Sequence, residues 1–143
     1  LHSTLTKELR TKIIENIFKE ILDKSMTQFS EELYMSPREL LELQKEGMSV
    51  GIHGYKHEWL NKMNYDDQKK DLIKAKTYLS EIGINLDNSS VCYPYGGYNA
   101  DTLKLAEELN FSLGLTTKVG ITRDEDLKNK FEIPRLDTND FPQ

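Results

Sequence analysis

The sequence predicts an α/β domain built from parallel strands and the helices that connect them. Short apolar runs with the length of buried strands alternate with longer stretches whose apolar residues recur at helical spacing. This alternation is typical of βα units in a parallel sheet. The 143 residues fit one domain, and no internal repeat or linker divides them. We therefore expect a single α/β domain over residues 1–143.

Four helices are predicted, and most are bounded by recognisable capping residues. Residues 6–23 place isoleucine and leucine side chains on one helical stripe. The next helix begins after Ser36, an N-cap that forms a capping box with Glu39, and it ends at Gly47. Two further helices are expected over residues 64–83, from the Asn64 cap to Gly83, and from the Asn99 cap to about residue 109.

Four strands are predicted between and after these helices. They are expected over residues 48–52, 90–93, 111–117 and 131–136. Pro134 predicts that the last strand is irregular. The polar residues before it, 122–130, are expected to form a loop or a single helical turn. Two helices precede the first predicted strand, so we expect the first strand of the sheet to be missing from this sequence.

Composition and charge exclude several classes of protein. The net charge of -5 and the absence of a basic cluster argue against nucleic acid as a partner. The single cysteine, Cys92, excludes an intramolecular disulfide and a zinc site built from cysteines, and we expect it to be a small core residue. No apolar stretch approaches the length of a membrane-spanning helix. No signal peptide is visible, but the sequence begins at Leu1, so cytoplasmic and cell-envelope locations both stay open.

Two of the three histidines lie four positions apart, directly after the first predicted strand. His53 and His57 in "VGIHGYKHEWL" therefore stand at the end of a strand, where sites assemble in βα architectures. Two imidazoles with a carboxylate can hold zinc and leave one coordination position open to water. The alternative is that both are polar turn residues. We expect no function for His2, which lies near the chain terminus.

A second junction between a strand and a helix carries the sequence "YPYGGYN", residues 93–99. One interpretation is a tight turn packed by aromatic rings. The other is the wall of a ligand groove, because tyrosine faces stack on sugar rings and glycine lets a ligand approach backbone N–H groups.

Together these two junctions, with the helix before the first, resemble the polysaccharide deacetylase family. Its members share the NodB-homology domain and are also called carbohydrate esterase family four. His53-Gly54-Tyr55-Lys56-His57 is similar to the family's second motif, His-Ser/Thr-x-x-His, and Cys92-Tyr93-Pro94-Tyr95-Gly96 to its third, Arg-x-Pro-Tyr-Gly. The resemblance is strongest over residues 34–116, and "FEIPRLDTND" continues it more faintly.

The resemblance implies part of a distorted (β/α) barrel and a metal-dependent hydrolase that acts on linear amides. Its substrate would be a polysaccharide or oligosaccharide with N-acetylated amino sugars, from which it removes acetyl groups. In such enzymes two histidines and an aspartate hold a divalent metal, and a second aspartate is the general base. Zinc is the expected ion, with cobalt and nickel as alternatives. A cell-envelope polysaccharide is the expected kind of substrate.

Carried over by position, the resemblance implies roles for individual residues. His53 and His57 would be metal ligands, and the backbone N–H of Tyr95 would contact the oxyanion. The expected substrate-binding residues are Tyr93, Pro94, Tyr95, Gly96 and Trp59, although Trp59 is also explained as a residue that packs its loop against the next helix.

The sequence also departs from the family pattern. Gly54 replaces the Ser/Thr of the second motif, and Cys92 replaces the arginine of the third, for which Arg135 is a candidate substitute in space. No Asp-Asp follows a strand, because Asp66-Asp67 begins a helix, and no histidine follows His57. We therefore expect an incomplete domain, central and C-terminal, that is impaired or inactive as a fragment. The alternatives are a noncatalytic carbohydrate-binding relative and, less favoured, a Cys–His hydrolase using Cys92.

Overall fold

The computed structural model describes residues 5–22 and 25–141, which divide into two compact units. The boundary between them follows Leu40 and falls inside helix α3 (Pro37–Lys45). The first unit contains α1 (Lys7–Ile17), a π-helical turn (Phe18–Leu22) and α2 (Met26–Leu33). No described helix is long and apolar enough to cross a membrane.

The second unit is an α/β unit, in agreement with the predicted fold class. Its helices are α4 (Tyr65–Glu81) and α5 (Ala100–Glu108), and its strands are β1 (Ser90–Cys92), β2 (Leu113–Val119) and β3 (Ile133–Arg135). Short 3-10 turns occupy Leu60–Lys62, Pro94–Gly96, Asp126–Asn129 and Thr138–Asp140. The second of these turns forms the junction that was predicted between β1 and α5.

The three strands form one parallel sheet in the order β1-β2-β3. Val91 of β1 pairs with Gly114 of β2, and an irregularity in β2 shifts its register against β3. On the other side of β1, Ile52 forms an isolated parallel bridge with Val91. The described residues thus contain a small parallel sheet, and the expected barrel is not seen in them.

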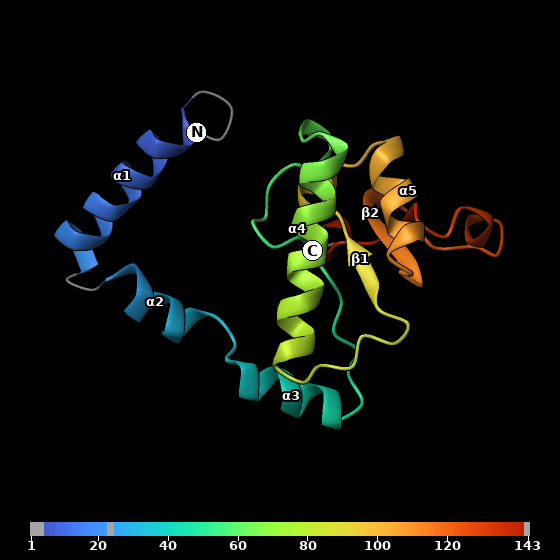
Figure 1. The fold of residues 1–143 in the computed structure, drawn as a ribbon, viewed down its shortest axis with the longest axis horizontal. Helices are drawn as coiled ribbons and strands as arrows, with labels where there is room; N and C mark the ends of the chain where they lie inside the picture. Colours follow the sequence, from blue (N-terminus) through green and yellow to red (C-terminus); the bar gives the residue numbers. More distant parts are fainter. Residues whose placement is uncertain (1–4, 23–24, 142–143) are drawn as a thin grey trace. The chain divides into compact units, whose positions relative to one another are not determined.

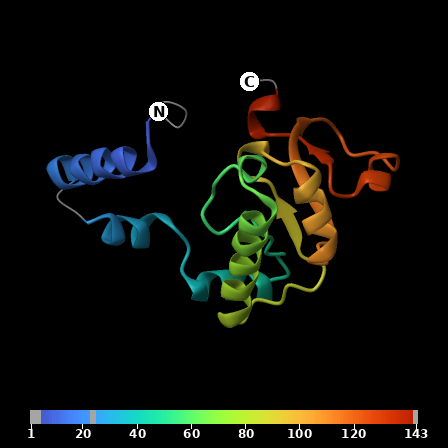
Figure 2. The same ribbon diagram turned by 45° about the horizontal axis from the view of Figure 1, so that its top comes forward.

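The core of the second unit lies between this sheet and the helices α4 and α5, which run beside β1 (Figure 1 and Figure 2). Apolar side chains from both helices and from β1 meet in one cluster, because each helix presents an apolar face at helical spacing. Its fully or nearly buried members are Ile52, Leu60, Leu72, Ala75, Val91, Tyr93, Leu105, Ala106 and Phe111.

The capping predictions are confirmed. The Ser36 hydroxyl accepts from Glu39 N while the Glu39 carboxylate accepts from Ser36 N, which is the predicted capping box. Asn64 and Asn99 cap α4 and α5, and Gly47 and Gly83 have the positive φ expected after a helix end.

Two secondary-structure predictions need correction. The predicted strand 48–52 is reduced to the single bridge at Ile52. Ile52 is buried, but residues 48–51 do not pair with a neighbouring strand. Helix α2 was not predicted, although Ser25 and Gln28 form a capping box at its start. The apolar stripe of α1 exists, but all four of its apolar side chains are exposed: Leu9, Ile13, Ile14 and Ile17.

Tyr93 makes the stability of this unit sensitive to alkaline pH. Its ring is 1% exposed and its hydroxyl donates to the Phe131 carbonyl (2.8 Å), and burial raises the pKa of Tyr93 above the ordinary tyrosine value. A tyrosine in the unfolded chain ionises near pH 10. The stabilisation is therefore complete below about pH 10 and is lost as the pH rises toward the higher folded-state pKa.

We expect the free energy of unfolding, measured by urea titration between about pH 8 and 11, to fall above about pH 10. Tyr93→Phe removes the ionising group and should make this fall shallower, while costing about 1–2 kcal/mol at neutral pH from the lost hydrogen bond. An unchanged alkaline slope in Tyr93→Phe would contradict the assignment.

Candidate active site

The two predicted motifs meet at one edge of the sheet. Ile52 N donates to Ser90 O and Cys92 N donates to Ile52 O, both at 2.8 Å, so residue 52 runs parallel to β1. The residues that follow these two segments, His53 and Tyr93, therefore leave the sheet at the same carboxyl edge. This is the edge where ligand sites form in parallel α/β sheets.

The two histidines form a converging pair. His53 Nδ1 lies 2.7 Å from the Cys92 carbonyl oxygen, and His53 Nε2 lies 3.1 Å from His57 Nε2. A carbonyl oxygen only accepts, so His53 Nδ1 carries the hydrogen, and Nε2 of the neutral ring presents a lone pair toward His57. The two imidazoles therefore lie side by side, and their role as metal ligands stays a prediction.

This pair fits two positions of a divalent-metal site. Two imidazole nitrogens, each about 2.0–2.1 Å from a tetrahedral zinc, lie about 3.3–3.4 Å from one another, close to the separation seen here. The bond from His53 Nδ1 to a carbonyl is also the outer contact that orients metal-binding histidines. Among residues 5–22 and 25–141, no group of three or more His, Cys, Asp or Glu side chains is arranged to hold a metal. The two histidines are therefore candidate ligands for two positions of such a site, and their role as ligands stays a prediction.

Cys92 and His53 perturb one another. The hydrogen bond with Cys92 raises the pKa of His53 above its ordinary value, and burial and the charge of Arg135 oppose this. The hydrogen bond with His53 lowers the pKa of the Cys92 thiol, against the effect of burial. Cys92 is partly exposed rather than a fully buried core residue. Both shifts favour a proton on the imidazole, so protons and a metal would compete for His53.

The ring of Tyr95 contacts the rings of His57 and Trp59. Its centroid is 4.7 Å from that of His57 and 4.9 Å from that of Trp59, with which it stacks at an interplanar angle of 14°. Trp59 and Tyr95 are 36% and 39% exposed, so this aromatic pair reaches the surface. Lys62 Nζ lies 4.9 Å from the centroid of the Trp59 ring. Trp59 thus stacks on the Pro94–Gly96 turn, and both expectations for it, packing of its loop against the next helix and contact with a sugar, stay predictions.

The backbone of the second junction has an unusual conformation that the sequence explains in part. Tyr95 has φ 56° and Gly96 has φ 69°, so two consecutive residues adopt the left-handed region. A Cβ on Gly97 would lie 2.9 Å from Trp59 Cε3 and 2.8 Å from Asn61 Oδ1. Glycine at position 97 therefore lets the two loops approach one another.

The structure divides the predicted substrate-binding residues into two groups. Tyr93 and Pro94 are buried, and the Tyr93 ring stacks on Tyr98 inside the unit. Side chains this buried present no face to a sugar, so their contribution is to fix the turn that follows them. Tyr95, Gly96 and Trp59 are the partly exposed members of the predicted set.

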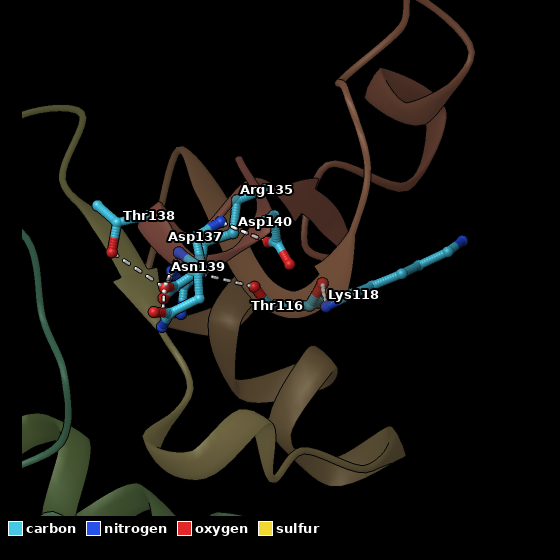
Figure 3. A network of polar contacts seen from close by, with 7 residues as sticks. All are labelled: Thr116, Lys118, Arg135, Asp137, Thr138, Asn139 and Asp140. Carbon is cyan, nitrogen blue, oxygen red and sulfur yellow. Dashed lines mark hydrogen bonds and ion pairs between the residues drawn. The ribbon is translucent and has the colours of Figure 1, made fainter. Parts of the chain in front are cut away.

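Arg135 lies at the end of β3, within a polar network (Figure 3). Its Nε donates to Thr116 O at 3.0 Å, and its guanidinium lies 3.8 Å from the Asp137 carboxylate. Its positive charge is near enough to lower the pKa values of both His53 and Cys92, although other effects on these pKa values are larger. The family motif has its arginine at the position of Cys92. Arg135 therefore places a positive charge near that position from a different strand.

One residue of the site was missed by the sequence analysis. Asp71 of α4 is 5% exposed, and its carboxylate accepts from Tyr55 N (2.8 Å) and Lys56 N (3.1 Å), between the two histidines. A signal was present in the sequence. Asp71 lies on the inward face of α4 beside Leu72 and Ala75, where an unpaired acid would be costly.

The geometry defines an α/β unit with a site at the carboxyl edge of a parallel sheet, and comparison with known proteins identifies its family. The model of the polysaccharide deacetylase family matches residues 11–114. The chain therefore belongs to the polysaccharide deacetylase family, and the resemblance found in its motifs is confirmed.

Two relatives show how much of a deacetylase the chain spans. YxkH of Bacillus subtilis (strain 168), which carries the name of a polysaccharide deacetylase, is 27% identical over 93 residues, which are 64% of this chain and 33% of YxkH. The solved structure of the Streptococcus pyogenes deacetylase PplD in complex with acetate matches with a TM-score of 0.63 and 28% identity, over 71% of this chain and 45% of PplD. The chain thus spans about a third and just under half of these two proteins.

Proposed function

We propose that this chain contributes the two-histidine part of a metal-dependent site that removes N-acetyl groups from amino-sugar polysaccharides or oligosaccharides. The observation that supports this most strongly is the convergence of His53 Nε2 and His57 Nε2, with His53 Nδ1 held by a carbonyl. Family membership makes a deacetylase the appropriate class of hydrolase.

In this proposal each residue has a defined task. His53 and His57 would hold a divalent ion, zinc in the first instance, through their Nε2 atoms. When bound, such an ion supplies Lewis acidity to the acetyl carbonyl and favours ionisation of water. The Tyr95 N–H would donate to the oxygen that gains negative charge. The contact between the Tyr95 and His57 rings supports this role, because it brings the turn of Tyr95 to the histidine pair. Arg135 would supply a positive charge that lowers the pKa values of His53 and Cys92.

The exposed Trp59–Tyr95 pair would provide the contact with the sugar. Tyrosine and tryptophan rings present apolar faces beside polar groups, which suits the alternating faces and hydroxyls of a sugar. The complex of PplD with acetate also fits the proposal, because acetate is the acid released by N-deacetylation.

A Co(II) titration followed by absorption spectroscopy tests the metal part of the proposal. We expect His53→Ala and His57→Ala each to weaken binding by at least about 100-fold, because loss of one of two imidazoles removes half of the observed ligand pair. His2→Ala, which removes the third histidine of the chain, is the matched control and should bind as the wild type does. Binding that is unaffected by either site substitution would overturn the proposal.

A second candidate is a noncatalytic carbohydrate-binding relative. It is favoured by the exposed aromatic pair, which can stack on a sugar without any metal. Chitooligosaccharide binding measured by calorimetry distinguishes the two. Binding that Trp59→Ala abolishes, in a protein that binds no Co(II), would support this candidate over the metal-dependent one.

A further inference from the structure

The backbone between His53 and His57 is held by one buried carboxylate from a different element, Asp71 of α4. We propose that Asp71 is a positioning residue, which makes His53 Nε2 and His57 Nε2 converge by fixing the loop between them. This inference rests on the proposed function for its importance, but the contacts that carry it are separate from the histidine pair.

The contacts are specific to a carboxylate. Each oxygen of Asp71 accepts from a different backbone N–H: Oδ2 from Tyr55 N at 2.8 Å and Oδ1 from Lys56 N at 3.1 Å. Two bonds to consecutive amides fix the orientation of both peptide planes. Hydrogen bonds to an ionised acceptor are also about twice as strong as neutral ones. An asparagine could accept only one of them, since its amide nitrogen would face a second donor.

Gly54 lets the loop fold over this carboxylate. Its φ is 69°, and a Cβ at this position would lie 3.0 Å from Asp71 Oδ2. A side chain here would both strain the backbone and press on the acceptor oxygen. Gly54 stands where the family motif has Ser or Thr and carries no hydroxyl, and the loop that follows it donates two backbone hydrogen bonds to Asp71 of α4.

The loop needs this support because its last residue is strained. His57 has φ 53°, a conformation that costs a non-glycine residue free energy unless its surroundings hold it. It directly follows Lys56, whose N–H is bound by Asp71. Without that bond, the backbone before His57 could relax to a negative φ, and the imidazole would turn away from His53.

The isosteric substitution Asp71→Asn tests the inference, with Asp66→Asn as the matched control on the exposed side of the same helix. We expect Asp71→Asn to weaken Co(II) binding by about 10–100-fold, the range typical of groups that orient metal ligands. Amide hydrogen exchange at Tyr55 and Lys56 should become at least about 10-fold faster, while exchange at the core residue Leu105 stays unchanged. Asp66→Asn should alter none of these.

A second variant covers the case in which Asp71→Asn fails to fold. Gly54→Ala keeps the carboxylate but displaces the loop from it, and we expect the same weakening of Co(II) binding and the same local increase in exchange. If wild-type protein binds Co(II) through its histidines and both variants bind it equally well, the inference is overturned while the proposed function stands.

Absence of Co(II) binding in the wild type would instead overturn the proposed function. In that case amide hydrogen exchange alone tests whether Asp71 fixes the loop. Faster exchange at Tyr55 and Lys56 in Asp71→Asn supports its role in fixing the loop, and unchanged exchange rejects it.

Discussion

Replacing Gly114 by alanine is expected to lower the free energy of unfolding by about 3 kcal/mol or more, the upper end of the range for overpacking. Gly114 lies in β2, in the centre of the sheet, and pairs with Val91. A Cβ there would overlap the Tyr93 hydroxyl and would lie 2.6 Å from Phe131 O and 2.9 Å from Phe131 Cα. Two of the three obstacles are backbone atoms, which cannot rotate away.

The same substitution should also break the hydrogen bond from Tyr93 to Phe131 O, because the new methyl group occupies the path of the hydroxyl. Urea unfolding followed by far-UV circular dichroism measures the effect. Gly120→Ala is the matched control, since the nearest atom that its Cβ would meet beyond the adjacent residues is Pro134 Cβ at 3.3 Å, and we expect it to cost at most about 1 kcal/mol. Equal destabilisation by the two substitutions would show that close packing at Gly114 is not the cause.

Leu60→Ala is expected to have the second large effect, a loss of about 2–5 kcal/mol, as for other buried leucines truncated to alanine. Leu60 is 0% exposed and lies in the core cluster with Leu72 and Leu105. Leu60 also follows Trp59 directly, so it attaches the loop that carries His53 and His57 to the core. The cavity left by truncation would loosen this attachment as well as remove apolar burial.

Thermal and urea unfolding of Leu60→Ala should be compared with Leu127→Ala. Leu127 is 58% exposed in a 3-10 turn, and its truncation should change stability by no more than about 0.5 kcal/mol. A Leu60→Ala protein as stable as Leu127→Ala would mean that the loop does not depend on the core at this point.

Local signals in the sequence predicted much of the second unit. Asn64 and Asn99 marked helix starts correctly because a cap acts over only three residues, and Gly83 marked an end for the same reason. The apolar run 48–52 led to a wrong strand prediction. Apolar residues indicate burial, whereas a strand also requires hydrogen-bond pairing with a neighbouring strand along its whole length. Only Ile52 has such a neighbour.

The family resemblance predicted the two motifs as parts of one candidate site, and the residue that was missed, Asp71, comes from a helix outside both motifs. His53 and His57 are four residues apart, and their convergence could be expected from the motif. The contact of Tyr95 with His57, and of Asp71 with the loop between the histidines, joins segments that only the packing of α4 and the pairing of Ile52 with β1 bring together. Burial of Tyr93 also depends on that packing, since alternation along a strand of three residues is too short to assign its faces.

Two neighbouring residues of the site, His57 and Tyr95, both hold a backbone conformation that costs L-amino acids roughly 1–2 kcal/mol each. Glycine would relieve that cost at either position, but it would remove an imidazole in one case and an aromatic ring in the other. Stability of the fold and the side chains of the candidate site therefore place opposite demands on these two positions.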